Sequence, residues 1–97
     1  MLASFRKTKI VCTIGPATAS LSAIKQLIHA GMNVARLNFY HCDLKGHRKT
    51  IKKILQAARE ETSTIVIEQD IAGHKIRLGQ INELRLTDGE EVVMISR

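Results

Sequence analysis

The sequence predicts an α/β fold with a parallel sheet. Within residues 9–70, three segments rich in Ile and Val alternate with two segments whose apolar residues recur at helical spacing. Strand–helix–strand units with short connections form right-handed crossovers between parallel strands. After Gly79 the pattern changes to two short β runs, residues 81–86 and 91–96, joined by a turn-rich link at residues 87–90. We expect an antiparallel hairpin there.

The first expected strand covers residues 9–14 and stops at a Gly-Pro pair. Ser20 is suited to cap the helix that follows, because its hydroxyl can accept a hydrogen bond from an N–H group of the first turn. The apolar stripe of this helix consists of Leu21, Ile24, Leu27 and Ile28. Gly31 stands where a carboxyl-terminal cap is expected.

The second expected strand covers residues 33–39, and the second helix begins near Asp43. This helix should fade near residues 62–63, and its apolar side is predicted to hold Leu44, Ile51, Ile54, Leu55 and Ala58. The third strand, residues 64–70, follows directly. A sheet of three parallel strands has two open edges with unpaired backbone groups, so we expect more chain or a partner to complete it.

All three strands are apolar at the start and polar at the end. Thr13, Arg36, Asn38 and Asp70 stand at or near the ends of the expected strands. Parallel strands bring such residues to one edge, where α/β sheets and barrels build their sites. The fork of donors on Arg36 matches a carboxylate or a phosphate. A structural ion pair of Arg36 is the alternative.

Composition limits the class of protein. The chain has 97 residues, of which 44% are hydrophobic and 3% aromatic, so one small domain with an Ile, Leu and Val core is expected. We find neither an apolar stretch that could span a membrane nor a signal-like amino terminus, and we expect a soluble, cytoplasmic protein. Cys12 and Cys42 are expected to be free thiols. His41 and His47 flank Cys42 and Asp43, but their spacing matches no metal-ligand pattern.

The net charge of +6 is unevenly distributed. Eleven of the fifteen Lys and Arg residues precede Glu60, whereas Asp43 is the only acidic residue before that point. This half of the chain favours anionic partners. The basic side chains around residues 45–53 form a helix face that could contact nucleic acid, but no aromatic residues interleave with them, so a solvated face is the preferred interpretation.

Three ordered motifs resemble the amino-terminal part of pyruvate kinase. They are residues 8–17 (TKIVCTIGPA), residues 31–39 (GMNVARLNF), and Asp70 to Gly73 together with Ile76 and Arg77. The resemblance spans roughly residues 6–79. It implies the first three β/α units of a TIM (β/α)8 barrel, with residues 1–79 belonging to the barrel domain and residues 80–97 opening the lid domain.

The resemblance also implies a function: phosphoryl transfer from phosphoenolpyruvate to ADP, giving pyruvate and ATP in glycolysis. It implies that Arg36 contacts the substrate phosphate as a catalytic residue. It assigns Arg77, His41 and the turn from Thr13 to Pro16 to the nucleotide side. The implied ligands of a monovalent cation, K⁺ in this family, are Asn38, Asp70 and Ile71, with Asn38 also near the substrate. It further implies a homo-oligomer for the complete protein.

The chain departs from the family pattern at several positions. Residues 38–42 are NFYHC where the family usually has NFSHG, so Tyr40 replaces a cation-ligating serine and Cys42 replaces a glycine that can adopt positive φ. Lys75 replaces a glutamate, and we expect this change to go together with Tyr40, the Lys75 ammonium group standing in for K⁺ at a site that has lost a ligand. Two further departures point the other way, toward relaxed constraint on the sequence. Ala72 stands where the family usually has a lysine, and the polar pair Glu68-Gln69 lies in a strand that is expected to be buried.

Essential parts of such a site are not among these 97 residues. The resemblance implies Mg²⁺, but the metal-binding carboxylate pair and the catalytic lysine lie beyond the matching segment. Glu68 and Asp70 face the same way and could hold Mg²⁺, although an inward polar pair of a barrel is the simpler interpretation. We therefore expect a truncated pyruvate kinase piece that is inactive alone. The alternative is a non-catalytic nucleotide-binding or assembly module that uses its open sheet edge.

Overall fold

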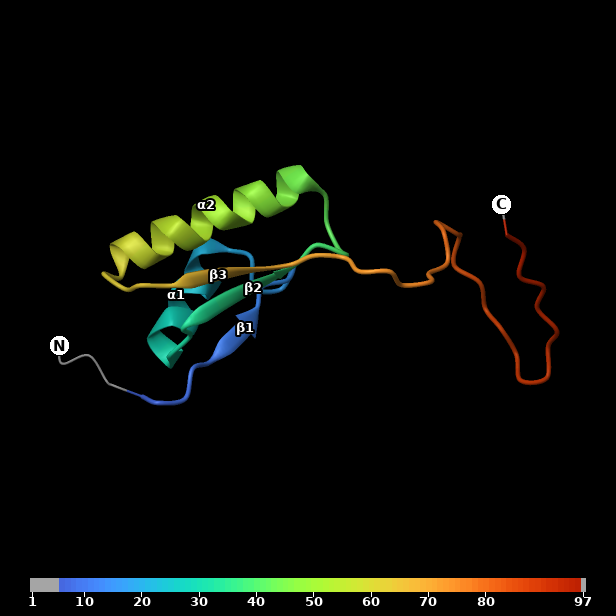
Figure 1. Ribbon diagram of the computed structural model, residues 1–97, viewed down its shortest axis with the longest axis horizontal. Coiled ribbons are helices and arrows are strands. Elements are labelled where there is room, and N and C mark those ends of the chain that lie inside the picture. The colour runs from blue at the N-terminus through green and yellow to red at the C-terminus, as the bar shows by residue number, and fades with distance from the viewer. Residues whose placement is uncertain (1–5, 97) are drawn as a thin grey trace.

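The computed structural model describes residues 6–96. The elements in chain order are β1 (Val11–Thr13), α1 (Leu21–Ala30), β2 (Val34–Asn38), α2 (Leu44–Glu60) and β3 (Val66–Asp70). The strands form one sheet in the order β1-β2-β3, and both pairs are parallel (Figure 1). The expected α/β class and the parallel sheet are confirmed. Each strand is shorter than predicted: the paired residues are 11–13, 34–38 and 66–70.

The predicted helix caps are confirmed. The Ser20 hydroxyl accepts a hydrogen bond from the N–H of Ala23 at 3.1 Å, which satisfies a donor of the first turn of α1. Gly31 ends α1 with φ at 111°, a left-handed conformation that glycine adopts without the steric cost of a Cβ atom. In α2 the Asp43 carboxylate accepts from the N–H of Gly46 at 2.8 Å. Local sequence chemistry therefore sets where both helices begin.

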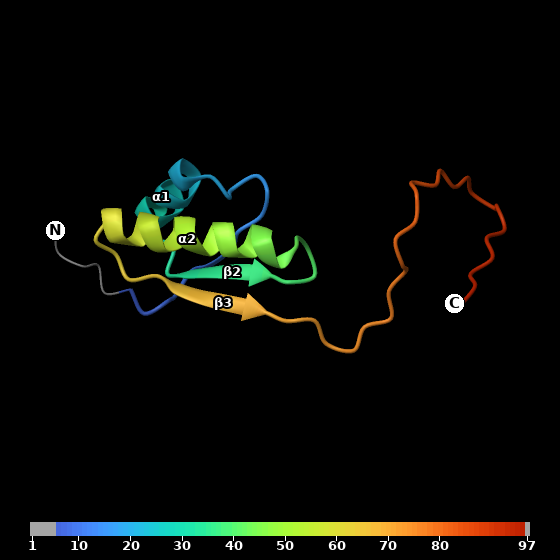
Figure 2. The ribbon, with the colours of Figure 1, turned by 90° about the horizontal axis from the view of Figure 1, so that it is seen from above.

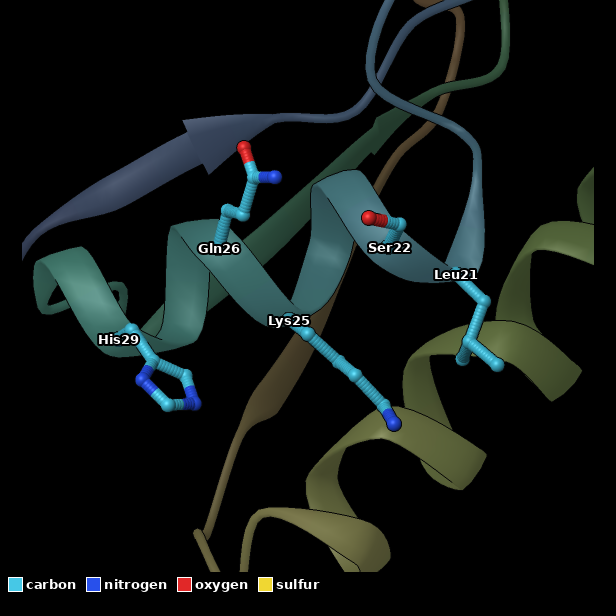
Figure 3. Close-up of a pocket in the computed structure, with 5 residues that line it drawn as sticks. All are labelled: Leu21, Ser22, Lys25, Gln26 and His29. Carbon is cyan, nitrogen blue, oxygen red and sulfur yellow. The ribbon is translucent and has the colours of Figure 1, made fainter.

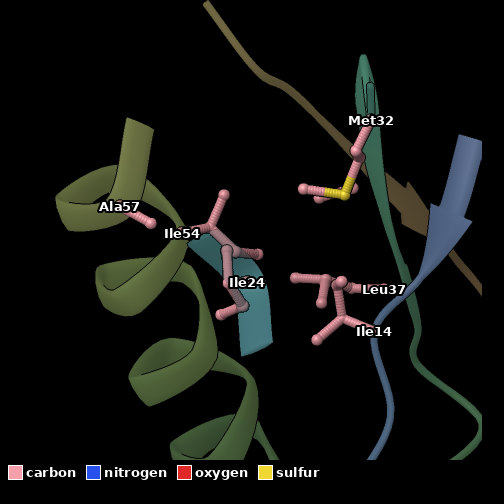
Figure 4. Close-up of a cluster of buried hydrophobic side chains, with 7 residues drawn as sticks. Ile14, Ile24, Met32, Leu37, Ile54 and Ala57 are labelled. Atoms are coloured by element: carbon pink, nitrogen blue, oxygen red, sulfur yellow. The ribbon is translucent and has the colours of Figure 1, made fainter. Parts of the chain in front are cut away.

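Both helices pack on the same face of the sheet (Figure 2). The core lies between this face and the helices, and Figure 4 shows its side chains meeting there. Its buried members are Ile14, Ile24, Met32, Ala35, Leu37, Ile54 and Ala57. Alternate residues of β2 enter the core, since successive side chains of a strand point to opposite faces. Burial of these apolar groups is the main source of stability for the layered part.

The predicted apolar side of α2 was partly wrong. Leu44 and Leu55 are 73% and 48% exposed, whereas His47, Ile54 and Ala57 are buried. The spacing of residues 47, 54 and 57 follows one helix face, and this face contacts α1 and the sheet. Apolar periodicity included two leucines that are exposed and missed two of the buried residues. The missed residues are a histidine and an alanine, which can fill positions where helices approach closely.

Within residues 6–96, no helix lies over the opposite face of the sheet (Figure 2). One row across this face consists of Val11, Val34 and Val66, which are partners in the strand register. Val11 is 51% exposed and Val66 is 58% exposed. The next row along the strands holds Thr13, Arg36 and Glu68, and the register then pairs Asn38 with Asp70. The polar residues therefore gather at the carboxyl ends of the strands, as the sequence predicted, and they lie on the face that the helices leave uncovered.

The expected hairpin and the third β/α unit are not formed. Within residues 71–96 the structure has neither a strand nor a helix, and all of these residues are exposed. The predicted turn exists: the N–H of Glu90 donates to the carbonyl oxygen of Thr87 at 3.1 Å, and Gly89 has φ at 84°. The flanking β runs do not pair, because an isolated two-stranded hairpin with no surface to pack on is marginally stable.

Residues 71–96 extend away from the layered part, and the molecule measures 60 × 28 × 25 Å (Figure 1). Across residues 6–96, neither helix combines the length and the apolar character that crossing a bilayer would require.

Candidate functional site

Thr13, Arg36 and Asp70 form a polar cluster at the carboxyl ends of the three strands. One guanidinium nitrogen of Arg36, Nη1, donates to Thr13 Oγ1 at 2.9 Å, and the other, Nη2, forms a charge-assisted hydrogen bond with Asp70 Oδ2. The Arg36 side chain is 28% exposed and that of Asp70 is 36% exposed. The parallel register that places Thr13 and Asp70 on either side of β2 therefore fixes the Arg36 guanidinium in one orientation. The ion pair foreseen as an alternative is present, and it leaves Arg36 accessible to solvent.

Asn38, the last residue of β2, organises the loop that follows it. Its Oδ1 accepts a hydrogen bond from the N–H of Tyr40 at 3.0 Å, and its backbone carbonyl accepts from the N–H of His41 at 3.2 Å. This is the local side chain-to-backbone bonding by which asparagine favours turns. Asn38 therefore fixes the backbone from which the Tyr40 side chain extends.

His47 has a structural role that the sequence analysis did not predict. Its ring stacks on Phe39 with centroids 4.1 Å apart and an interplanar angle of 4°. Its Nε2 lies 2.6 Å from the carbonyl oxygen of His41, to which it donates in the appropriate tautomer. The signal was available, because His47 shares the helix face of Ile51 and Ile54. His47 thus ties the first turn of α2 to the loop after β2.

Tyr40 contacts the segment that follows β3. Its phenol oxygen accepts a hydrogen bond from the N–H of Gly73 at 2.8 Å. The Lys75 ammonium lies 5.1 Å from the centroid of the Tyr40 ring, and the guanidinium carbon of Arg77 lies 4.8 Å from it. Both distances are within cation–π range. Tyr40, one departure from the family pattern, therefore contacts a second one, Lys75.

The structure brings the predicted site residues together only in part. Arg36, Asn38 and Asp70 meet at the strand ends, and Arg77 lies against Tyr40. His41 and Pro16 are exposed, the latter in a turn held by Thr18. Ile71 follows Asp70 directly and is 68% exposed. Within residues 6–96, the hydrogen bonds of His41 involve only its backbone N–H and carbonyl groups.

Two of the three residues proposed to ligate a monovalent cation, Asn38 and Asp70, already make hydrogen bonds through their side-chain oxygens. Asp70 Oδ2 pairs with Arg36, and Asn38 Oδ1 accepts from the N–H of Tyr40. Hard cations need several oxygen ligands at once. No group of three or more His, Cys, Asp or Glu side chains suited to a metal occurs in residues 6–96. These residues alone therefore do not provide a complete cation site.

A shallow pocket lies elsewhere, along the outer side of α1 (Figure 3). It is lined by Leu21, Ser22, Lys25, Gln26 and His29. Lys25 forms an ion pair with Glu60 and lies 3.9 Å from Glu61, and His29 also contacts Glu61. The hydrogen bond to Glu60 raises the pKa of Lys25, and the same bond, together with that from Gln56, lowers the pKa of Glu60. These contacts hold α1 against the end of α2, and no residue of the polar cluster lines this pocket.

Cys42 adopts a backbone conformation that favours glycine. Its φ is 70°, in the left-handed region. The thiol lies 3.9 Å from Asp43 Oδ1, and a Cβ atom built on Gly46 would lie 2.1 Å from the Cys42 Sγ. A cysteine thus stands where the backbone favours a glycine, and its side chain occupies space left by Gly46.

Comparison with known proteins identifies a family. The family model described as "Pyruvate kinase, barrel domain" matches residues 5–96. The pyruvate kinase of Geobacillus stearothermophilus is 45% identical over 91 residues, and that of Corynebacterium glutamicum is 47% identical over 87 residues. These alignments cover 92% and 90% of this chain but 16% and 17% of the relatives. The chain therefore spans about a sixth of the length of these relatives.

Solved structures agree with this result. Two crystal structures of pyruvate kinase from Cryptosporidium parvum are each 46% identical to the chain, with TM-scores of 0.64 and 0.66. The similarity covers 66% and 68% of this chain, and 13% and 14% of the crystallised ones. The β and α elements described above therefore have the arrangement of a small part of those enzymes.

Proposed function

The chain belongs to the pyruvate kinase family, and on that premise we propose that it carries the substrate-phosphate corner of an enzyme that transfers a phosphoryl group from phosphoenolpyruvate to ADP. The observation that supports the proposal most directly is the cluster of Thr13, Arg36 and Asp70 at the carboxyl ends of parallel strands. Barrel enzymes build their sites at this end. Pyruvate and ATP are the products of the proposed reaction.

Arg36 is the proposed catalytic residue of this part of the site. Transfer of a phosphoryl group develops charge on its oxygens, and a fixed guanidinium neutralises that charge without reorganising. Thr13 and Asp70 hold Arg36 in place, so the orientation of its donors does not depend on the substrate. The Asp70 carboxylate also balances part of the charge while the site is empty. A partly exposed, oriented arginine is suited to bind an anion.

The nucleotide side is proposed to involve Arg77, His41 and Pro16. Arg77 supplies a positive charge beside Tyr40, and His41 and Pro16 are exposed near the ends of the first two strands. Residues 1–79 would belong to the barrel domain and residues 80–97 to the start of the lid. The change from a layered to an extended chain after Asp70 supports a boundary in this region, although the family match continues through residue 96.

The family's metal ions enter the proposal in two ways. Mg²⁺ would supply Lewis acidity to the transferring phosphoryl group, with ligands that are not in this chain. Asn38, Asp70 and the backbone oxygen of Ile71 would be the local part of a monovalent cation site. Lys75 would replace K⁺ there, and its contact with Tyr40 supports a linked change at both positions. The complete protein would be a cytoplasmic homo-oligomer, and this chain alone would be inactive.

The test is binding of phosphoenolpyruvate and of ADP by the 97-residue chain, measured by isothermal titration after light scattering has established its mass. Arg36→Ala should weaken binding of phosphoenolpyruvate about tenfold, and Arg77→Ala should weaken binding of ADP about tenfold, since each removes a charge-assisted contact. Arg85→Ala is the matched control, because Arg85 is an exposed arginine of the extended segment. Equal affinity in all four proteins would overturn the assignment of these arginines.

A coupled assay with phosphoenolpyruvate, ADP, Mg²⁺ and K⁺ addresses the second candidate function. An inactive monomer agrees with a partial site. A compact oligomer that binds ADP but never turns over, even when the missing barrel segments are supplied, would favour the nucleotide-binding or assembly module, which the two open sheet edges make possible. Binding that weakens steeply with salt and ignores both arginines would favour nucleic acid instead.

A further inference from the structure

Tyr40 is the main polar link between two parts of the chain. Within residues 6–96, the hydrogen bond from the N–H of Gly73 to the Tyr40 phenol oxygen is the only one that joins residues 71–96 to the layered part. The two cation–π contacts of the extended segment, from Lys75 and Arg77, also end on the Tyr40 ring. None of the ion pairs among these residues involves a residue after Asp70.

The Tyr40 end of this link is rigidly placed. Asn38 Oδ1 accepts a hydrogen bond from the backbone N–H of Tyr40, with a donor–acceptor distance of 3.0 Å. The next residue, His41, donates to the Asn38 carbonyl and its own carbonyl oxygen lies 2.6 Å from His47 Nε2. His47 is buried and stacks on Phe39. The backbone on both sides of Tyr40 is therefore anchored to β2 and α2.

The other end of the link carries positive charge and has little support of its own. Residues 73–77 are all exposed, and their one internal hydrogen bond runs from the N–H of Lys75 to the carbonyl oxygen of Gly73. A shallow hollow follows this segment and is lined by His74, Lys75, Ile76, Arg77 and Leu78. Without Tyr40, the two cationic side chains would sample many rotamers, at an entropic cost to any ligand that fixes them.

We propose that Tyr40 is a positioning residue that holds Gly73 to Arg77 over the end of β2 and so presents Lys75 and Arg77 to a polyphosphate anion. This rests on the proposed function for the identity of the ligand, a nucleoside diphosphate or its phosphates. A serine at this position has neither a ring for the cations nor a hydroxyl that reaches as far from the backbone. Tyr40 therefore has a role that the serine could not fill: it contacts Gly73, Lys75 and Arg77 directly, where the serine would ligate a cation.

The first test is made on the intact chain without ligand. Tyr40 is its only tyrosine, and it has no tryptophan, so tyrosine fluorescence reports on this ring alone. By NMR, the side-chain protons of Lys75 and Arg77 should show upfield ring-current shifts, and the Gly73 amide should be protected from exchange. Tyr40→Phe should keep the ring-current shifts and lose the amide protection, whereas Tyr40→Leu should lose both. Absence of these shifts in the wild-type chain would overturn the proposal.

The second test uses inorganic pyrophosphate as the probe. Tyr40→Leu should weaken its binding about fivefold, the effect of two lost cation–π contacts, and Tyr40→Phe should weaken it less. Circular dichroism on each variant confirms that the helices are intact. If wild type and Tyr40→Leu bind pyrophosphate equally, the proposal fails while the proposed function stands. If the ring contacts are present but neither ADP nor pyrophosphate binds, the ligand assignment and the proposed function fail together.

Discussion

The layered part of the molecule, residues 9–70, differs from the extended part, residues 71–96, in one physical respect. Both contain many Ile, Leu and Val residues, but only the layered part buries them. Ile24, Leu37 and Ile54 are fully buried there, whereas Ile81, Leu84 and Leu86 are each at least 60% exposed. Local β propensity is present in both parts, so propensity alone does not form structure.

The difference teaches that the helices supply what the extended part lacks. Each strand of the layered part has an apolar face on which α1 and α2 pack, and this burial offsets the loss of chain entropy. The residues after Asp70 have no such partner within this chain. Their one turn forms because its bonds are local: Glu90 accepts hydrogen bonds from both the backbone and the side chain of Thr87, and the backbone bond, as the larger cause, lowers the pKa of Glu90.

The largest expected effect comes from a core substitution. Leu37→Ala should lower the free energy of unfolding by about 3 kcal/mol, because it leaves a cavity beneath both helices. Leu86→Ala, the same change in the extended part, should alter it by less than about 0.5 kcal/mol. Urea unfolding followed by far-UV circular dichroism measures both. Equal losses would mean that the extended part shares a core with the layered part in solution.

A smaller gain is expected from relieving the backbone at Cys42. Cys42→Gly should stabilise the chain by about 1 kcal/mol, since glycine adopts a φ of 70° without a Cβ clash. Cys42→Ser is the control, because it replaces the thiol and keeps the Cβ atom. The same urea experiment applies. A gain in the serine variant as large as in the glycine variant would locate the strain in the thiol rather than in the backbone.

The smallest expected effect concerns the surface ion pair of Lys25 and Glu60. The pKa of Glu60 is lowered by folding, so its contribution is present above the unfolded pKa of the carboxyl and is lost as pH falls through the folded value. The pKa of Lys25 is raised, so its contribution is present below the unfolded pKa of the amine and is lost as pH rises through the folded value. Stability should therefore show a plateau between these two limits.

Thermal unfolding across pH tests this expectation. Glu60→Gln should lower Tm slightly on the plateau and flatten its acid side, since exposed pairs contribute little. Lys52→Gln, at another exposed position of α2, is the control and should leave the acid limb unchanged. An unchanged acid limb in Glu60→Gln would show that other carboxylates determine the acid transition, and that the pair does not contribute to holding α1 on α2.

Much of the candidate site could be predicted from the sequence. The meeting of Arg36 and Asp70 followed from polar residues placed at the ends of strands that must be parallel. The helix face of His47 indicated its burial and the family departures indicated a link between Tyr40 and Lys75, but the stacking on Phe39 and the ring contacts of Tyr40 could not be foreseen. These contacts join residues 8 to 37 positions apart, and their existence depends on where a helix or a loop comes to lie.

The sequence by itself determined the order and type of the elements and the positions of the caps at Ser20, Gly31 and Asp43, because these depend on interactions between near neighbours. Only the tertiary structure decided which side of α2 is buried, with Ile54 inside and Leu55 outside, and whether residues 81–96 form strands. Apolar periodicity gives the capacity for burial. The surface that accepts it is built by distant parts of the chain, and where none is present the apolar residues stay exposed.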